Sequence, residues 1–197
     1  MDVLLYAAEG SNSAARVEWV LNFKRVVYTR VEVDNSQLKT DYLTVNPLGL
    51  VPCLSVDGYR IAESMAIIEC LEELFPVPGV LGKTPFERAA IREVCEYVNA
   101  SIHTPQNRTV LKALRPELTV SAKRELRGQW ITSGLERLST RLCLRSGFAV
   151  GEHFSAADIF VACIYQKAKQ HGADTMPFYE AHSALLRQHP EVARAEP

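Results

Sequence analysis

The sequence lacks the features that mark several classes of protein. Its 197 residues include 22 basic and 23 acidic side chains, a formal net charge of −1. No charge excess therefore favours nucleic acid or an acidic membrane as a partner. Apolar runs such as residues 17–21 are too short to span a bilayer. Residues 1–10 lack the basic start and apolar stretch of a secretory signal.

The five cysteines form no recognisable framework. They are widely scattered, with no CxxC pair and no histidine at metal-ligand spacing: Cys53, Cys70, Cys95, Cys143 and Cys163. An odd, dispersed set of this kind indicates reduced thiols in the core rather than disulfides or a zinc site. The sequence therefore predicts a cytoplasmic globular protein without a bound metal.

The first third of the chain mixes strand and helix patterns. Short apolar or alternating stretches predict strands, and amphipathic stretches predict helices. The expected strands are residues 3–7, 26–33, 51–56 and 59–61, and the expected helices are residues 14–23, 38–44 and 63–74. The last two strands flank an Asp57-Gly58 turn typical of a hairpin. The order β-α-β-α-β-β-α predicts a small α/β domain over residues 1–75.

The remainder of the chain reads as helical. Residues 76–85 are rich in proline and glycine and are the natural linker. Beyond them the apolar spacing predicts an all-helical bundle over residues 86–197 and no convincing strand. The expected helical stretches are residues 86–114, 119–146, 155–171 and 178–188.

Three short segments of the α/β domain carry candidate chemistry. Pro52 opens a strand directly after a turn, so the Val51–Pro52 bond is a candidate cis peptide, although a trans proline at an edge strand fits equally well. Glu63 and Ser64 stand where a helix begins, and free N–H groups make that end an anion site. Residues 11–13 (SNS) precede another helix, where a serine either caps the helix or donates to a ligand.

Several of these segments together resemble the glutathione transferase superfamily, most closely the zeta class with its maleylacetoacetate and maleylpyruvate isomerases. The segments are residues 46–54 (NPLGLVPCL), 63–73 (ESMAIIECLEE), 106–111 (QNRTVL) and 155–158 (SAAD). The resemblance implies a thioredoxin-like N-terminal domain, an all-α C-terminal bundle and glutathione as cofactor. It also implies a homodimer, with the linker and the start of the first long helix as the contact.

The resemblance assigns roles in holding glutathione. It implies a cis Val51–Pro52 bond that exposes the Val51 backbone, so that the peptide of glutathione pairs with it as an added strand. It implies that Ser64 binds the γ-glutamyl carboxylate and that Glu63 accepts from the neighbouring ammonium. Residues 155–158 correspond to the capping box of the helical domain, a structural role.

The resemblance also assigns roles in catalysis. Ser11 matches the serine that supports the thiolate, and a hydroxyl donor at a helix N-terminus lowers the pKa of a thiol. Ser13 stands in place of a cysteine and is the alternative. Arg16 also matches the pattern, whereas Asn12 and Glu18 depart from it.

The helical domain supplies the other expected site residues. Gln106 matches a glutamine that approaches glutathione, and His103 resembles a histidine that faces the active site. Arg16 and Arg108 are candidate clamps for a dicarboxylate substrate. A lone histidine on a helix is as often structural.

Three functions fit these observations. The leading interpretation is a glutathione transferase that activates the thiol for attack on a small electrophile, as in conjugation. An alternative is a zeta-type cis–trans isomerase of maleylacetoacetate or maleylpyruvate. The departures between residues 11 and 18 leave open a non-catalytic binding or scaffold protein with the same fold.

Overall fold

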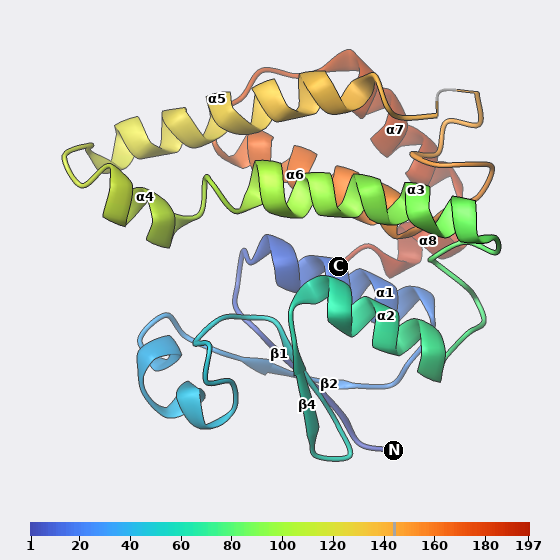
Figure 1. Ribbon diagram of the computed structural model, residues 1–197, viewed down its shortest axis with the longest axis horizontal. Coiled ribbons are helices and arrows are strands. Elements are labelled where there is room, and N and C mark those ends of the chain that lie inside the picture. Colours follow the sequence, from blue (N-terminus) through green and yellow to red (C-terminus); the bar gives the residue numbers. More distant parts are fainter. Residues whose placement is uncertain (144) are drawn as a thin grey trace. The chain divides into compact units, whose positions relative to one another are not determined.

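A computed structural model describes residues 1–143 and 145–197 of the chain (Figure 1). They divide into two compact units, residues 1–80 with 190–197, and residues 81–189. The division falls within the expected linker. Residue 144, part of the expected helix 119–146, lies outside the described residues.

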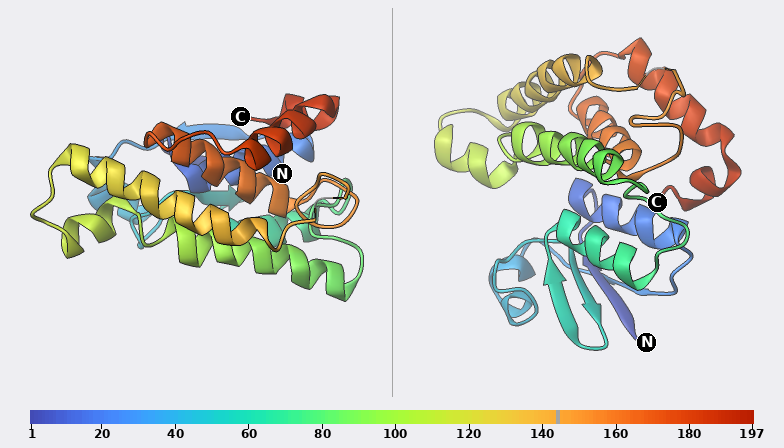
Figure 2. Two further views of the ribbon diagram at one scale, coloured as in Figure 1. Left: turned by 90° about the horizontal axis from the view of Figure 1, so that it is seen from above. Right: turned by 45° about the vertical axis from the view of Figure 1, so that its right-hand side comes forward.

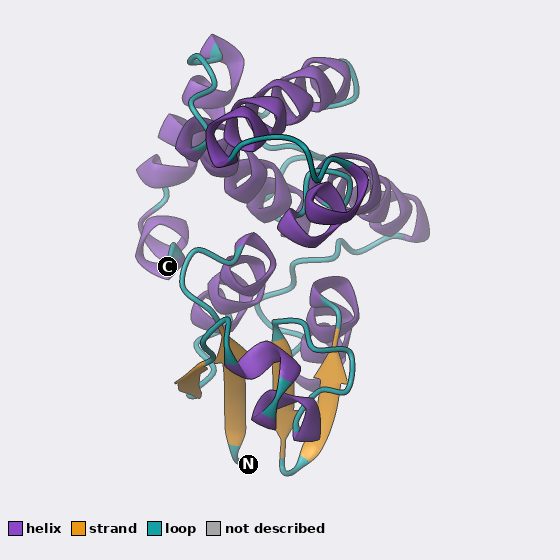
Figure 3. Ribbon diagram, turned by 90° about the vertical axis from the view of Figure 1, so that its left-hand side faces the viewer, coloured by secondary structure: helices purple, strands orange, loops and turns teal. Residues whose placement is uncertain are grey.

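The first unit contains a mixed four-stranded sheet in the order β2-β1-β3-β4. Figure 3 shows its strands in orange. Its strands are β1 (Val3–Ala7), β2 (Thr29–Glu32), β3 (Cys53–Val56) and β4 (Tyr59–Ala62). β1 pairs with β2 in parallel, while the β1–β3 and β3–β4 pairs are antiparallel. The parallel pair requires the helical crossover that the sequence predicts. β2 is shorter than the expected strand 26–33.

Three α-helices accompany this sheet: α1 (Asn12–Phe23), α2 (Ser64–Leu74) and α8 (Pro190–Ala195). α1 and α2 lie on one face of the sheet (Figure 1). Apolar side chains of the two helices are buried, among them Val17, Ile67 and Leu71. Two 3-10 helices, η1 (Gln37–Lys39) and η2 (Asp41–Thr44), stand where a single short helix was expected. The expected thioredoxin-like α/β arrangement is confirmed.

The C-terminal residues 190–197 join the first unit rather than the helical one, unlike the expected domain 86–197. α8 packs on α1, where Asn22 Nδ2 donates to the carbonyl of Ala195 at 3.1 Å. Val192 and Ala195 are buried there. α8 has only six residues and two buried apolar side chains, so its sequence shows too little periodicity to predict the helix or its packing on α1.

The second unit is a helical bundle around α6 (Ala156–Gln170). α6 is buried over its first ten residues and packs against α3 (Pro85–Glu96), α5 (Val120–Ser139) and α7 (Pro177–Gln188) (Figure 2). In the described part of the chain, no helix is both long and apolar enough to cross a membrane.

The start of α6 is the capping box that the sequence predicts. The buried Asp158 carboxylate accepts from the Ser155 N–H at 2.8 Å and from the Ala149 N–H at 2.7 Å. His182 Nε2 lies 2.9 Å from the same carboxylate. These contacts tie α6, α7 and the preceding loop together.

The expected helical stretch 86–114 is interrupted. α3 continues into a π-helical segment, η3 (Tyr97–His103), and a loop then leads to α4 (Arg108–Leu114). Pro105 lies in that loop, and proline cannot donate the backbone hydrogen bond of a continuing helix. Asn107 begins α4 by accepting from the Thr109 N–H at 3.1 Å. α5 likewise ends at Ser139, before the end of the expected stretch 119–146.

Candidate active site

The strand register brings the expected glutathione-binding segments of the first unit to one edge of the sheet. Tyr6 of β1 pairs with Cys53 of β3, and Cys53 pairs with Ala62 of β4. The end of β1, the start of β3 and the end of β4 therefore meet. Ser11 follows β1, Val51 precedes β3 and Ser64 follows β4, so all three leave the sheet at this edge.

Ser11 is the N-cap of α1. Its backbone is extended, and its Oγ accepts from the Ala14 N–H at 3.3 Å. Accepting this bond leaves the hydroxyl hydrogen able to donate to a second group. Capping and donation to a thiolate are therefore compatible at Ser11. Ser13 is the second residue of α1 and is not its cap.

Arg16 lies one turn into α1 and is fully buried. Its Nη2 donates to Oδ1 of Asn12 at 2.6 Å. The structure thus buries Arg16 beside its helix neighbour Asn12, and the expected clamp on a substrate carboxylate stays a prediction. Asn12, which departs from the zeta-class pattern, instead partners Arg16 within the helix. The i, i+4 spacing of Asn12 and Arg16 on a helix is visible in the sequence, but the burial of the pair is not.

The Val51–Pro52 peptide bond is cis, as the sequence motif predicts. Val51 lies two residues before Cys53, outside the ladder that pairs β3 with β1. The preceding turn is fixed by Asn46, whose Nδ2 donates to the carbonyl of Leu50 at 2.7 Å. Gly49 has a φ of +64°, and a Cβ there would lie 2.8 Å from the carbonyl oxygen of Leu38. The motif therefore builds a rigid turn that presents the Val51 backbone.

Glu63 and Ser64 form the junction between β4 and α2. Glu63 has φ 69° and ψ 118°, a left-handed conformation that is strained for a residue with a side chain. Its side chain is exposed, whereas Ser64 is buried as the first residue of α2. The first N–H groups of a helix have no partner within that helix. The strained turn therefore places a hydroxyl and helix N–H groups together, the donors that a carboxylate needs.

The helical unit holds the other expected site residues. Gln106 is buried, and both ends of its amide are engaged: Nε2 donates to the His103 carbonyl at 2.8 Å, and Oε1 accepts from Arg127 Nε at 2.9 Å. The amide keeps one further N–H donor and one further lone pair, so the expected contact of Gln106 with glutathione stays a prediction. His103 is half-buried at the end of η3, and Arg108 is exposed at the start of α4.

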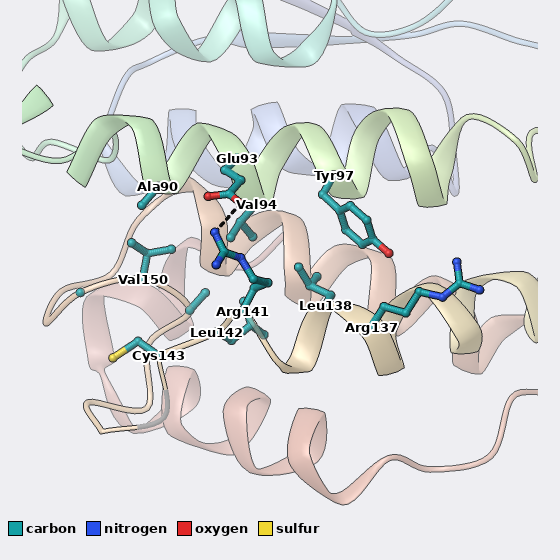
Figure 4. Close-up of a pocket in the computed structure, with 12 residues that line it drawn as sticks. Ala90, Glu93, Val94, Tyr97, Arg137, Leu138, Arg141, Leu142, Cys143 and Val150 are labelled. Atoms are coloured by element: carbon teal, nitrogen blue, oxygen red, sulfur yellow. Dashed lines mark hydrogen bonds and ion pairs between the residues drawn. The ribbon is translucent and has the colours of Figure 1, made fainter. Parts of the chain in front are cut away.

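Each unit also contains a cavity. In the first unit, a cavity of about 660 Å³ opens at the carboxyl ends of β1 and β2, next to the loop before Ser11, and Glu9, Glu32 and Asp34 are among its lining residues. In the helical unit, a cavity of about 520 Å³ lies between α3 and the end of α5 (Figure 4). An Arg141–Glu93 ion pair crosses it, and none of the expected site residues lines it.

The described residues contain no group of three or more histidine, cysteine or acidic side chains placed to hold a metal ion. The donor set at the sheet edge is instead suited to a peptide. It comprises the backbone of Val51 before β3, the hydroxyl and N–H groups at the start of α2 around Ser64, and the hydroxyl of Ser11.

The chain matches the family model of the glutathione S-transferase N-terminal domain over residues 5–81. It is 32% identical to the maleylacetoacetate isomerase of Pseudomonas aeruginosa over 202 residues, covering 98% of this chain and 95% of that protein. A maleylpyruvate isomerase described as a bacterial zeta-class glutathione S-transferase has a similar structure, with TM-score 0.90 and 28% identity over 98% of this chain and 96% of that one.

A second solved structure, of a maleylacetoacetate isomerase from Methylobacterium extorquens, was determined with bound malonate and GSH. Its TM-score is 0.88 at 30% identity, covering 98% of this chain and 96% of that one. Sequence and fold therefore agree over nearly the whole chain, which belongs to the glutathione transferase superfamily of enzymes and is most similar to its zeta class.

Proposed function

We propose that the chain is a glutathione-dependent cis–trans isomerase of a maleyl diketo acid, maleylacetoacetate or maleylpyruvate. The observation that carries the proposal is the near full-length similarity to proteins that are named for this reaction. It reverses the order of the hypotheses drawn from the sequence, which ranked conjugation to an electrophile first. The comparisons favour the isomerase alternative.

Glutathione is held by the sheet-edge donors. The Val51 backbone pairs with the peptide as an added strand, because Val51 lies outside the sheet ladder. Ser64 and the N-terminus of α2 bind the γ-glutamyl carboxylate, and the exposed Glu63 accepts from the ammonium. The bound GSH of the Methylobacterium extorquens structure supports this cofactor.

Glutathione supplies a thiolate that adds reversibly to the double bond of the substrate, which can then rotate about a single bond before the thiolate leaves. The chain must keep this thiol ionised. Ser11 donates its hydroxyl hydrogen to the sulfur while its oxygen lone pair caps α1. The positive end of the α1 dipole favours the same charge. Ser13 is the alternative donor.

The substrate is a dicarboxylate, and cations or hydrogen-bond donors must receive its carboxylates. Arg16 and Arg108 are the candidates for this role; Arg108 is exposed at the start of α4, whereas Arg16 is buried in this structure and would need a local rearrangement to reach a ligand. The malonate in the Methylobacterium extorquens structure supports a site for small dicarboxylates.

A direct comparison of two reactions tests the proposal. The full-length chain is assayed for isomerisation of maleylpyruvate with and without glutathione, and for conjugation of glutathione to an aryl halide. The isomerase function predicts rapid isomerisation that requires glutathione, and conjugation that is slow beside it. Rapid conjugation without isomerisation would restore the transferase interpretation. Glutathione binding without either reaction would support the non-catalytic one.

A further inference from the structure

The π-helical segment η3 interrupts the regular helix of the helical unit. It covers the seven residues Tyr97–His103, and Thr104 closes its last turn by donating from its N–H and its Oγ1 to the Asn99 carbonyl, at 3.0 and 2.8 Å. A π-helical turn closes its hydrogen bond one residue later than an α-helical turn, and such turns are frequent at functional sites. The extra residue rotates every following residue by about 100° relative to a continuous α-helix. The register of η3 therefore sets the direction of the residues that follow it.

A glycine on α5 lets η3 approach that helix closely. Gly134 and Ile102 are both buried, and η3 packs against α5. A Cβ at position 134 would lie 2.7 Å from Cγ1 and 2.9 Å from Cδ1 of Ile102. Isoleucine is branched at Cβ and stiff about χ1, so its Cγ1 does not move aside freely. A side chain at position 134 would therefore shift η3 relative to α5.

A tryptophan on the same face of α5 holds a backbone carbonyl of η3. Trp130 lies one turn before Gly134. Its Nε1 donates to the Ser101 carbonyl at 3.2 Å, while its side chain stays 46% exposed. In an α-helix this carbonyl would accept from the N–H of residue 105, but Pro105 has no N–H. The indole of Trp130 therefore supplies a donor that the backbone lacks at this point.

A third residue of α5 holds the loop after η3. Arg127 Nε donates to Oε1 of Gln106 at 2.9 Å, and Gln106 Nε2 donates to the His103 carbonyl at 2.8 Å. Positions 127, 130 and 134 have the i, i+3, i+7 spacing of a single helix face. One face of α5 therefore contacts the segment 101–106 at three points.

This segment leads directly to the expected site residues of the helical unit. The Thr104 carbonyl accepts from the Asn107 N–H at 3.1 Å, and Asn107 caps α4, which begins at Arg108. A tight turn and a capped helix leave little slack between η3 and Arg108. A shift of η3 along α5 would therefore move His103, Gln106 and Arg108 together.

We propose that Trp130 and Gly134 are positioning residues for the isomerisation. They fix the π-helical register of η3, and through it the placement of Gln106 for glutathione and of Arg108 for the substrate. This role rests on the proposed function. Because both residues act through η3, their substitution should impair substrate binding and turnover in protein that is fully folded.

The test compares the full-length wild type with Trp130→Phe, which removes the indole N–H but keeps an aromatic ring, and with Gly134→Ala. Isomerisation of maleylpyruvate is measured at saturating glutathione, at a temperature where circular dichroism shows each protein folded. We expect kcat/KM to fall about a hundredfold in Gly134→Ala and about tenfold in Trp130→Phe, with a higher KM in both. Gln129→Ala changes the neighbouring exposed residue of α5 and should keep the wild-type values.

The KM separates positioning from a purely structural role. Partial unfolding lowers the concentration of active enzyme and hence the apparent kcat, but it leaves KM unchanged. Trp130→Phe adds no atoms to the core, so it decides the outcome even if Gly134→Ala folds poorly. The positioning role alone is overturned if the wild type isomerises maleylpyruvate and Trp130→Phe keeps the wild-type KM. A wild type that does not isomerise maleylpyruvate overturns the proposed function, and the positioning role with it.

Discussion

Replacing Lys24 by methionine should strongly destabilise the first unit. The Lys24 side chain is fully buried at the end of α1, and its Nζ lies 2.6 Å from Glu72 Oε2. It also donates to the carbonyls of Phe75 and Pro78, each at 2.7 Å. The Glu72 carboxylate accepts in turn from the Val80 N–H. One ammonium thus holds α1, the end of α2 and the start of the linker together.

The expected magnitude follows from what remains after the substitution. Methionine fills the same space, but it leaves the Glu72 carboxylate buried without its cation. Breaking a buried pair from one side costs about 3–5 kcal/mol. Two carbonyls also lose their donor, and since such terms are not additive, we expect a total loss of about 3–5 kcal/mol in the free energy of unfolding.

Equilibrium urea unfolding followed by Trp19 fluorescence measures this loss. Trp19 is buried in α1, and a Trp130→Phe background removes the only other tryptophan. The double variant Lys24→Met/Glu72→Gln removes both charges of this buried pair, so it should be more stable than Lys24→Met alone. A loss below about 1 kcal/mol for Lys24→Met, or a double variant no more stable than the single one, would refute the reasoning.

Three further predictions concern binding, pH and assembly. Ser64→Ala should weaken glutathione binding by about 1.5–3 kcal/mol in calorimetry, because the carboxylate loses a charge-assisted donor, and unchanged affinity would contradict the assignment. Below pH 6.5 the unfolded chain binds a proton that folded His171, with its pKa of about 4, does not. As the pH is lowered from about 6.5 to about 4, the free energy of unfolding should therefore fall by about 1–3 kcal/mol. His171→Gln should make the free energy of unfolding less dependent on pH in this range, as measured by urea titrations. We expect a homodimer with an isologous contact through the linker and the start of α3, and a monomer mass in light scattering at micromolar concentration would contradict it.

The sequence predicted the elements whose patterns are local. The buried run of β1, the Asp57-Gly58 hairpin and the amphipathic α2 all carry their own periodicity or turn residues, and the structure confirms them. The motif at residues 46–54 also predicted the cis bond at Val51–Pro52. These features depend on neighbouring residues, which a sequence displays directly.

The features that the sequence did not predict depend on distant residues or on small local breaks. The burial of Arg16 depends on the residues that pack around α1. The hydrogen bond that Gln106 accepts comes from Arg127, which is 21 residues away. The helix breaks after η3 at Pro105. The apolar spacing on both sides of this proline nevertheless predicted one continuous helix. α8 packs on α1, which is more than 160 residues away in the sequence, since Asn22 bonds to Ala195 at a separation of 173 residues.

The most direct test of the account is the rate of maleylpyruvate isomerisation at saturating glutathione in the wild type, Ser11→Ala and Ser13→Ala. Ser11 caps α1 and is proposed to stabilise the thiolate, whereas Ser13 lies inside the first turn. The account predicts glutathione-dependent isomerisation by the wild type, a large loss in Ser11→Ala with little change in glutathione affinity, and near wild-type activity in Ser13→Ala. It would be contradicted by a wild type that does not isomerise maleylpyruvate with glutathione bound, or by a loss confined to Ser13→Ala.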